Sequence, residues 1–249
     1  MTDNQRVLIV TGGGRGIGAA IVRLAARDGY AVCFNYTRDE TAARTLLREL
    51  LDQGLRAQVV RGDIADPDTA RRLFDQAESD LGAVTGLVNN AGVTGHIGAF
   101  RDVDLATLRR VLDVNVLGTM LCAQEAVRRW EARGTPGRMV NISSIAATLG
   151  APHEYVHYAA TKAAVETFTV GLAREVAAGG IRVNAVSPGT AFTDIHATAG
   201  EPDRPARVVS RVPMGRIGEP DEIAEAVLWL LSDKASYVTG AVLRVAGGL

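Results

Sequence analysis

A tyrosine and a lysine four residues apart form the first pair in this chain whose spacing could support chemistry. Tyr158 and Lys162 stand in the segment Tyr-Ala-Ala-Thr-Lys, and only two of the 27 basic residues are lysines. Side chains at i and i+4 of a helix lie on one face, so the ammonium would sit beside the phenol. A cation within about 4 to 6 Å favours the ionised form of tyrosine. The pair predicts a tyrosine that exchanges a proton with an alcohol or ketone; an exposed pair on an amphipathic helix is the alternative.

A glycine-rich turn near the N-terminus predicts the binding of a dinucleotide. The sequence Thr-Gly-Gly-Gly-Arg-Gly-Ile-Gly at residues 11–18 lies between a predicted strand and a predicted helix. Such a turn lets backbone N–H groups approach a pyrophosphate at the positive end of the helix. Any tight turn uses glycine, but this strand, turn and helix order is the one that dinucleotide binding requires. The cofactor-binding residues predicted here are Gly12, Gly14, Arg15, Gly16, Ile17 and Gly18.

The end of the second predicted strand indicates which dinucleotide fits. An acidic residue there would accept hydrogen bonds from a free adenosine ribose, but residues 34–38 contain none. Arg38 and Arg15 could instead flank a 2′-phosphate through charge-assisted contacts. We therefore expect NADP(H) to be favoured over NAD(H), with two solvated surface arginines as the alternative. After the third predicted strand, Asp63 could bond the adenine amino group or cap the next helix, and Ile64 follows it.

Short β-branched segments alternate with longer helical patterns along the whole chain. Strands are predicted at residues 7–11, 31–36, 57–62, 86–89, 138–142, 181–186 and 242–245. This alternation predicts an α/β protein: a single-domain doubly wound Rossmann fold, in which a seven-stranded parallel sheet has helices on both faces. Ligands of such sheets bind outside the carboxyl ends of the strands. We expect one domain over residues 1–249, with a substrate loop at about 190–217, the long segment without clear periodicity.

Composition excludes several classes of partner. The net charge of −1 gives no attraction to nucleic acid or to an anionic membrane. Polar residues 1–6 lead straight into the first predicted strand, and no run of about 18 apolar residues is present. We therefore expect a cytoplasmic protein without a membrane segment. Cys33 and Cys122 lie in apolar stretches, which predicts buried free thiols.

The remaining charged and titratable residues support no metal site. The four histidines lack tight spacing with carboxylates or cysteines, so no metal is expected. His96 and His153 each follow a predicted strand and are expected to line the cleft. The pairs Arg109-Arg110 and Arg128-Arg129, on one long helix that begins near residue 105, are expected on solvated faces.

Several motifs occur in a fixed order, and together they resemble the short-chain dehydrogenase/reductase family over nearly the whole chain. They are the glycine turn at 11–18, Asn89-Asn90-Ala91-Gly92, Asn115 within residues 113–116, Ser143-Ser144, Tyr158 with Lys162, Pro188-Gly189 leading to Thr193, and the tail from Gly215 through Gly240. Such an ordered set is far more specific than any one motif.

The resemblance implies hydride transfer between a nicotinamide and a carbonyl or alcohol carbon. Tyr158 would donate or remove the proton, and Lys162 would lower its pKa and bond the nicotinamide ribose. Ser144 would hydrogen-bond the substrate oxygen, and Asn115 would hold a water that links Lys162 to solvent. The further cofactor contacts that the resemblance implies are Asn90, Ala91, Gly92, Tyr158, Lys162, Pro188, Gly189 and Thr193.

The chain departs from the family pattern just before the tyrosine. Ser144 lies 14 residues before Tyr158, whereas one residue fewer is usual in the family, which indicates an extra residue between 149 and 157. Ser143 is therefore the fallback for Ser144. The extra residue also makes Glu154, Tyr155 or His157 possible substrate contacts.

The sequence thus favours an NADP-dependent carbonyl reductase or alcohol dehydrogenase with a small-molecule carbonyl or alcohol substrate. It is most similar to 3-oxoacyl-carrier-protein reductases and glucose-dehydrogenase-like members. Gly179-Gly180 stand where a basic residue often meets the acyl carrier, so binding of a carrier is less secure than the reductase chemistry. An NAD-dependent sugar or alcohol dehydrogenase and a non-catalytic dinucleotide sensor are the alternatives. The family resemblance implies a homodimer or homotetramer.

Overall fold

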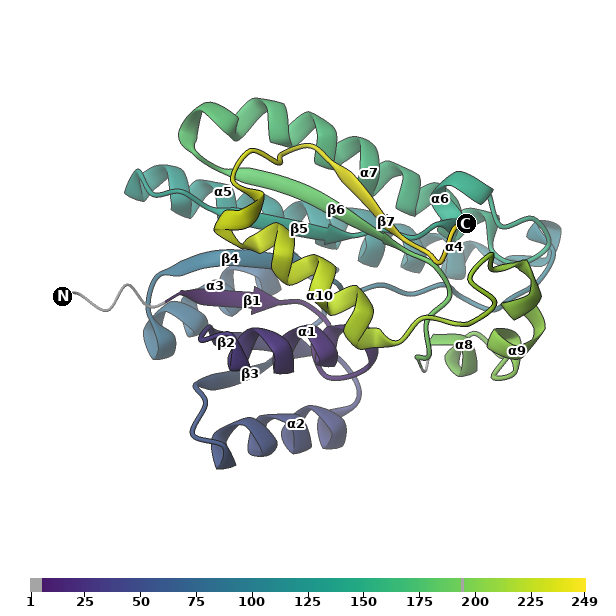
Figure 1. Ribbon diagram of the computed structural model, residues 1–249, viewed down its shortest axis with the longest axis horizontal. Helices are drawn as coiled ribbons and strands as arrows, with labels where there is room; N and C mark the ends of the chain where they lie inside the picture. Colours follow the sequence, from purple (N-terminus) through teal and green to yellow (C-terminus); the bar gives the residue numbers. More distant parts are fainter. Residues whose placement is uncertain (1–5, 194) are drawn as a thin grey trace.

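Seven parallel strands form one sheet in the order β3-β2-β1-β4-β5-β6-β7 (Figure 1). The computed structural model describes residues 6–193 and 195–249. Its strands are β1 (Val7–Val10), β2 (Ala31–Tyr36), β3 (Ala57–Arg61), β4 (Val84–Asn89), β5 (Arg138–Ile142), β6 (Arg182–Pro188) and β7 (Val242–Val245). The strand order reverses at β1, which pairs with β2 on one side and β4 on the other. The predicted doubly wound fold is confirmed.

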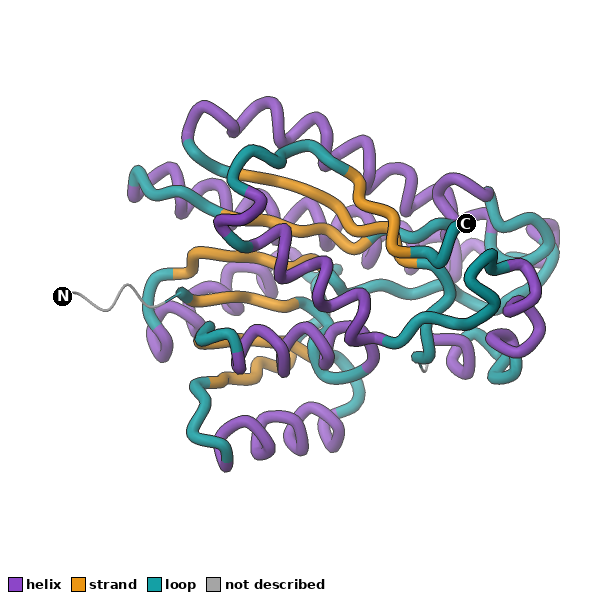
Figure 2. The backbone as a smooth tube through the Cα atoms, viewed as in Figure 1, coloured by secondary structure: helices purple, strands orange, loops and turns teal. Residues whose placement is uncertain are grey.

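Helices cover both faces of the sheet (Figures 1 and 2). Apolar side chains of α1, α2 and α10 pack on one face, and those of α3, α5 and α7 pack on the other. The helices are α1 (Gly16–Arg27), α2 (Glu40–Asp52), α3 (Pro67–Leu81), α4 (Leu105–Leu112), α5 (Thr119–Arg133), α6 (Ala146–Leu149), α7 (Val156–Val176), α8 (Ile195–Thr198), α9 (Arg204–Val208) and α10 (Pro220–Leu231). Because both faces are covered, β1 and β2 are buried at every position, as is usual for parallel strands.

Short-range signals in the sequence set the starts of two helices. Asp66 caps α3, since its side chain accepts a hydrogen bond from the N–H of Asp68, and Pro67 occupies the first turn. In α10 the carboxylate of Glu222 accepts from the N–H of Glu219, and Pro220 begins the helix. These residues set the start of a helix that runs from Pro220 to Leu231.

The helix expected from residue 105 onward is divided. A π-helical turn, Asp113–Gly118, separates α4 from α5 and contains Asn115. The prediction of one continuous helix did not include this turn. Such turns often mark functional sites.

Two of the four arginines expected on solvated faces are ion-paired, so the expectation is wrong for them. Arg129 is only 18% exposed and contacts three carboxylates on α3 and α5. Arg110 pairs with Asp63 at 2.7 Å. Asp63 and the two α3 carboxylates that bind Arg129 come from other elements, which a periodicity argument on one helix does not include.

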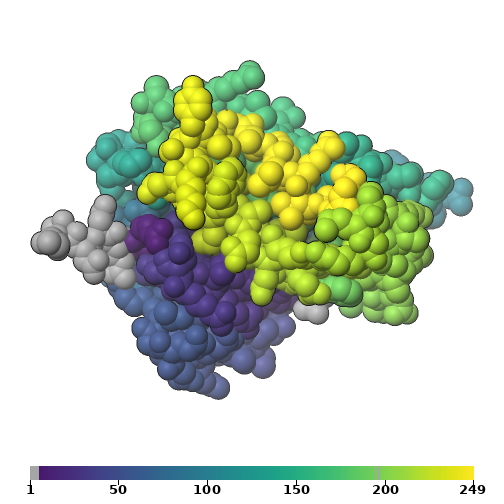
Figure 3. Space-filling model, viewed as in Figure 1, coloured from purple at the N-terminus to yellow at the C-terminus, as the bar shows by residue number. Residues whose placement is uncertain are grey.

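The segment 190–217 contains more regular structure than the aperiodic loop predicted for it. The helices α8 and α9 and a 3₁₀ turn, Val209–Arg211, lie within it. Elements of three to five residues are too short for a periodic pattern to appear. Figure 3 shows the green residues of this segment packed beside the yellow C-terminal residues. Residue 194 lies outside the described part of the chain.

The structure tests the expected state of the two thiols and the expected absence of a membrane segment. Cys33 and Cys122 are buried and free, and burial raises the pKa of each thiol to about 12. Among the described residues, no helix has the length and apolarity needed to span a bilayer. The expected lack of a targeting segment concerns residues 1–5, which lie outside the described residues.

Gly137 gives a test of the packing beneath β5. A Cβ at this position would lie 2.2 Å from the ring of Trp130, which is fully buried and donates a hydrogen bond to the carbonyl of Val84. We expect Gly137→Ala to lower the free energy of unfolding by about 2 to 3 kcal/mol, because the ring and its hydrogen bond must shift. Denaturant unfolding measures this change.

Gly171→Ala is the matched control. Gly171 is exposed in α7, and its Cβ would meet no atom within 4 Å. Alanine there should raise the free energy of unfolding by about 0.5 to 1 kcal/mol. A Gly137→Ala variant as stable as Gly171→Ala would contradict the packing described for Trp130.

Candidate active site

A cavity of about 490 Å³ opens at the carboxyl edge of the sheet, beside the point where the strand order reverses. The segments that follow the first six strands all contribute to its lining. Every residue predicted for catalysis or cofactor binding lines this cavity except Asn115. The residues it brings together are Gly12, Gly14, Arg15, Gly16, Ile17, Gly18, Arg38, Asp63, Ile64, Asn90, Ala91, Gly92, Ser144, Tyr158, Lys162, Pro188, Gly189 and Thr193.

The glycine turn between β1 and α1 is packed so closely that side chains are excluded. A Cβ on Gly18 would lie 2.3 Å from the carbonyl oxygen of Gly12 and 2.5 Å from Nδ2 of Asn90. That amide donates to the carbonyls of Thr11 and Gly12, at 3.0 Å each. Gly12 and Gly16 have φ values of 63° and 52°, which glycine adopts without strain.

The same turn fits the phosphates of a dinucleotide. The N-cap residue of α1 is Arg15, and no side chain of the described residues caps this end of the helix. The first N–H groups of a helix need acceptors, and its positive end favours an anion. The N-terminus of α1 therefore faces the cavity as an anion-binding site lined by glycine.

The end of the cavity beside β2 and β3 contains both charges that the sequence indicated. Arg15 and Arg38 line it, and the neighbouring Asp39 is engaged as the N-cap of α2, where its Oδ1 accepts from the N–H of Ala42. Asp63 does not cap α3. Its Oδ1 accepts from the N–H two residues later, and its Oδ2 pairs with Arg110.

Arg110 is a lining residue that sequence reasoning placed on a solvated face. Its guanidinium is about one third exposed and lies 2.7 Å from the Asp63 carboxylate. No local pattern in α4 distinguishes it from Arg109. Only the packing of α4 beside the end of β3 brings the two charges together.

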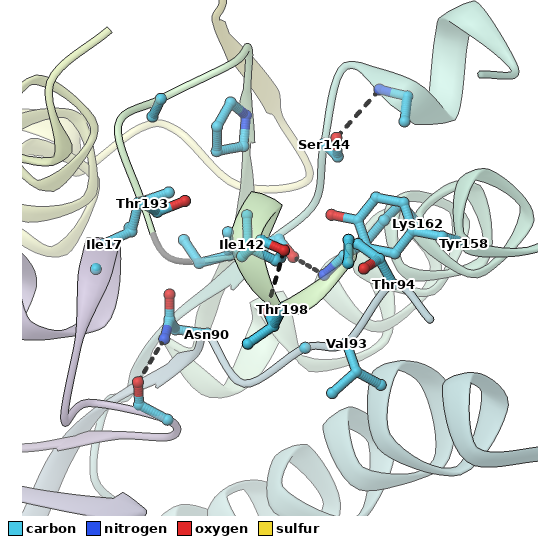
Figure 4. A pocket seen from close by; sticks show the side chains of 18 of the residues that line it. Ile17, Asn90, Val93, Thr94, Ile142, Ser144, Tyr158, Lys162, Thr193 and Thr198 are labelled. Carbon is cyan, nitrogen blue, oxygen red and sulfur yellow. Dashed lines mark hydrogen bonds between the residues drawn. The ribbon is translucent and has the colours of Figure 1, made fainter. Parts of the chain in front are cut away.

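Tyr158 and Lys162 lie one helical turn apart on α7 and point into the cavity, with Ser144 across from the tyrosine (Figure 4). The tyrosine is 8% exposed and the lysine 4%. Nζ of Lys162 donates a 2.7 Å hydrogen bond to the carbonyl of Ile142, and it lies 5.6 Å from the centroid of the Tyr158 ring. The i, i+4 geometry expected from the sequence is present.

Burial dominates the acid–base properties of this pair. It raises the pKa of Tyr158 to about 12, against the lowering effects of a hydrogen bond with Ser144 and of the positive charge of Arg204. Burial also lowers the pKa of Lys162 to about 8. The sequence predicted that Lys162 would lower the tyrosine pKa; here the lowering influences are Ser144 and Arg204, and burial exceeds both.

The two candidate serines have different partners. Both line the cavity, but Ser143 is only 2% exposed and its hydroxyl is engaged, donating to Oε1 of Glu166 at 2.7 Å. Ser144 lines the cavity and bonds Tyr158. Its Oγ also accepts from the N–H of Ala146, which orients the side chain (Figure 4). The geometry favours Ser144 over the fallback Ser143.

Asn115 does not line the cavity but connects two segments that do. Its Oδ1 accepts from the N–H of Val93, and its Nδ2 donates to the carbonyl of Val93 and to the hydroxyl of Thr161. These bonds join the segment after β4 to α7. A Cβ on Gly92 would lie 3.3 Å from Nζ of Lys162 and 3.4 Å from Oδ1 of Asn115, so glycine leaves space beside the ammonium.

The segment with the extra residue contributes two of its three candidate contacts. Glu154 and Tyr155 line the cavity, and the Tyr155 ring meets that of Tyr158 edge-on, with centroids 5.2 Å apart. His157 does not line it, because its Nε2 is bonded to the carbonyl of Thr94 at 2.8 Å.

The expectation that His96 and His153 line the cleft is wrong, since neither is among the lining residues. His96 lies against Gly200, and His153 has a φ of 62° in the turn before α7. Within the described residues no group of three histidine, cysteine or carboxylate side chains could hold a metal ion. The arginines 204 and 211, contributed by and just after α9, are lining residues that no motif indicated.

Comparisons with known proteins agree over the whole chain. A family model described as enoyl-(acyl carrier protein) reductase matches residues 12–249. An uncharacterized oxidoreductase of Escherichia coli, YgfF, is 45% identical over 97% of this chain and 99% of its own length. The cis-4-hydroxycyclohexanecarboxylate dehydrogenase of Sinomonas cyclohexanicum is 42% identical over 98% and 96%.

A solved structure is similar in fold and sequence. It is described as a blue fluorescent protein from a metagenomic library in complex with NADPH. It superposes with a TM-score of 0.89 at 37% identity and covers 100% of this chain and 99% of its own. A short-chain type dehydrogenase/reductase from Mycobacterium marinum superposes with a TM-score of 0.92 at 32% identity, covering 98% and 94%.

The buried ammonium of Lys162 predicts a stability that depends on pH. Its pKa of about 8 in the folded protein lies below the ordinary 10.5, so the unfolded chain binds more protons between these values. The lysine therefore destabilises the fold fully below pH 8, and this penalty is lost as the pH rises toward 10.5. We expect Lys162→Met to raise the free energy of unfolding at pH 7 by about 2 kcal/mol, after the lost hydrogen bond to Ile142 is deducted.

Urea unfolding at pH 7 and at pH 10 measures this difference, which should shrink at the higher pH. The chain's other lysine provides the control. Lys234 is exposed, and Lys234→Met should change the free energy of unfolding by less than about 0.5 kcal/mol at either pH. Equal effects of the two substitutions would show that burial of Lys162 has no energetic consequence.

Proposed function

The chain belongs to the short-chain dehydrogenase/reductase family, and from this premise we propose that it is an NADP(H)-dependent carbonyl reductase or alcohol dehydrogenase with Tyr158 as its acid and base. It is an oxidoreductase of alcohols or carbonyls with a nicotinamide cofactor. The observation that supports the finer assignment is the buried cluster of Ser144, Tyr158 and Lys162 at the same cavity edge as the glycine turn.

The cavity residues have distinct parts in this reaction. When bound, the nicotinamide supplies or accepts the hydride at the substrate carbon. During reduction the Tyr158 hydroxyl donates its proton to the substrate oxygen as negative charge develops there, and Ser144 donates a hydrogen bond that orients this oxygen. A phenol whose pKa is near 12 holds its proton until such a basic oxygen forms.

Lys162 would hold the nicotinamide ribose. Its ammonium bonds the carbonyl of Ile142, which leaves two of its three N–H donors for a ligand. A pKa of about 8 also lets this group exchange a proton near neutral pH. Asn115 supports Lys162 indirectly, because it ties Thr161 of α7 to the segment after β4. A bridging water on Asn115 stays a prediction.

Arg15 and Arg38 support the choice of NADP(H). Both line the cavity, and the two carboxylates that line it beside them are engaged, Asp39 in capping α2 and Asp63 in an ion pair with Arg110. A guanidinium pair would bond a 2′-phosphate strongly, whereas a free ribose is best held by an acidic residue at the end of β2, where residues 34–38 contain none. The similar structure that was solved with NADPH supports the same choice.

We propose further that residues 1–249 form one domain and that 190–217 covers the substrate. Residues of α8 and α9 line the cavity, which supports this role for the segment. The family implies a homodimer or homotetramer, and the exposed side chains of Leu105, Leu112 and Met120 give α4 and α5 an apolar surface suited to it. Cytoplasmic location stays a prediction.

Tyr158→Phe tests the proposed chemistry. The variant should lose at least about 1,000-fold in kcat with any substrate that the wild type turns over, because no other cavity group can supply the proton at that position. NADPH binding, followed by fluorescence titration, should change less than about threefold. The substrates are a panel of ketones, sugars, hydroxy acids and acyl thioesters assayed with NADPH or NADP⁺.

Tyr237→Phe is the control, because Tyr237 is fully exposed and should leave kcat unchanged. Substantial activity in Tyr158→Phe would overturn the tyrosine mechanism. A wild type that binds NADPH but turns over no member of a broad panel would favour a non-catalytic dinucleotide sensor.

Arg38→Asp tests the cofactor choice. The substitution removes a cation from the adenosine end and adds a carboxylate, so KM for NADPH should rise roughly 10- to 100-fold while KM for NADH stays the same or falls. Steady-state kinetics with both cofactors measure this change. Arg128→Asp, an exposed position on α5, controls for the altered net charge. An equal loss with both cofactors would refute the 2′-phosphate contact.

A further inference from the structure

A buried ion pair joins the substrate segment to the start of the catalytic helix. The Oε2 atom of Glu154 accepts from Nη2 and Nε of Arg204, at 2.6 and 3.1 Å. Its Oε1 accepts from Arg207 at 2.9 Å. Glu154 and Arg204 are each 9% exposed, and both line the cavity. The fork of Arg204 is thereby fixed in one orientation.

The guanidinium of Arg204 rests on an aromatic pair. Its Cζ lies 5.1 Å from the centroid of the Tyr155 ring. That ring in turn meets Tyr158 edge-on, with centroids 5.2 Å apart and planes at 84°. Glu154, Arg204, Tyr155 and Tyr158 thus form a continuous series of contacts from α9 to the reacting phenol. Such cation–ring and edge-to-face contacts restrict a ring to one position.

The backbone between α6 and α7 needs this support. Ala151 and His153 have φ values of 47° and 62°, which are unfavourable for residues other than glycine by roughly 1 to 2 kcal/mol each. They lie in the stretch where the extra residue occurs. Glu154 holds this stretch from two sides, because its carbonyl accepts from the N–H of Gly98 and its carboxylate binds α9.

We propose that Arg204 is a positioning residue for proton transfer: it fixes Tyr155 against Tyr158 and places a positive charge behind the reacting phenol, while Glu154 holds Arg204 in place. The inference rests on the proposed function, because it concerns Tyr158 as the proton donor. It assigns the extra residue a purpose, since the longer turn brings Glu154 within reach of α9.

The charges around Tyr158 come from several elements. Burial is the largest influence on its pKa, and of the four charged members of the ion-paired cluster only Arg204 has a resolved effect on it. The net charge of the cluster formed by Glu154, Glu201, Arg204 and Arg207 is zero. Its effect on the pKa of Tyr158 therefore depends on the position of each charge. The polar and charged groups that face Tyr158 or line the cavity around it, among described side chains, are Ser144, Glu154, Tyr155, Lys162, Arg204 and Arg211.

Arg204 and Arg207 provide a matched pair for the test. Both donate to the Glu154 carboxylate, but Arg207 is 40% exposed and does not line the cavity. The measurement is kcat/KM for alcohol oxidation between pH 6 and pH 10.5, with the substrate found in the panel. In this direction the rate rises as Tyr158 ionises.

Arg204→Gln should move the rising limb of this profile to higher pH by about one unit and lower kcat about tenfold, because the positive charge that favours ionisation of Tyr158 is lost. Arg207→Gln should leave the limb within about 0.2 unit of wild type. The affinity of both variants for NADPH should match that of wild type. Equal shifts in the two variants, or no shift in Arg204→Gln, would overturn the proposal.

Arg204→Lys keeps the charge and removes the fork. We expect its rising limb to stay near that of wild type while kcat falls severalfold, because Tyr155 loses its fixed contact. An unchanged kcat in Arg204→Lys would also refute the positioning role. If Arg204→Gln does not fold, Arg204→Lys alone tests the proposal. Tyr158→Phe separates the two hypotheses: if it stays active the proposed function fails, whereas an inactive Tyr158→Phe with an unaltered Arg204→Gln leaves that function intact.

Discussion

The arrangement of the site depends on one constraint, the parallel pairing of strands that are buried on both faces. Backbone hydrogen bonds satisfy the polar groups inside the sheet, and helices cover its sides, so polar side chains and loops gather at its ends. All parallel strands end at the same edge. The glycine turn, Asn90, Ser144 and Pro188 are far apart in sequence and follow four different strands, yet they meet in one cavity. The reversal of strand order at β1 opens the space between them.

Within that cavity, burial and ionisation oppose each other. Desolvation raises the pKa of Tyr158 and lowers that of Lys162, so both side chains favour their neutral forms more than they would in water. A tyrosine that holds its proton firmly and a lysine that loses one easily are suited to passing a proton in either direction. The same desolvation makes the site costly to fold, because an ammonium that is 4% exposed has one hydrogen bond within the described residues, to a carbonyl.

The sequence predicted the features that follow from short-range rules. The positions of the seven strands, to within two residues at each end, and the i, i+4 placement of Tyr158 and Lys162 depend on local patterns, and the structure agrees with them. The ion pairs of Arg110 and Arg129 depend on which helices pack together, and no pattern within one helix contains that information. The π-helical turn at Asn115 was not predicted for a related reason. Asn115 forms hydrogen bonds with Val93 and Thr161, which belong to other parts of the chain. The family could nevertheless be identified from the order of the motifs along the chain, because that order requires no knowledge of tertiary contacts.

The turn before Tyr158, in which the family pattern predicts an extra residue, shows how local chain length can acquire a tertiary role. A longer turn must fold back within the same space, and here it does so through left-handed conformations at Ala151 and His153. Strain of this kind persists only where other contacts hold the backbone. Glu154 supplies them through its bonds to Gly98 and to two arginines of α9. The ion pairs of Glu154 therefore connect α9 to the turn before α7, so we expect substitutions in α9 to act on the position of Tyr158 as well as on the shape of the cavity.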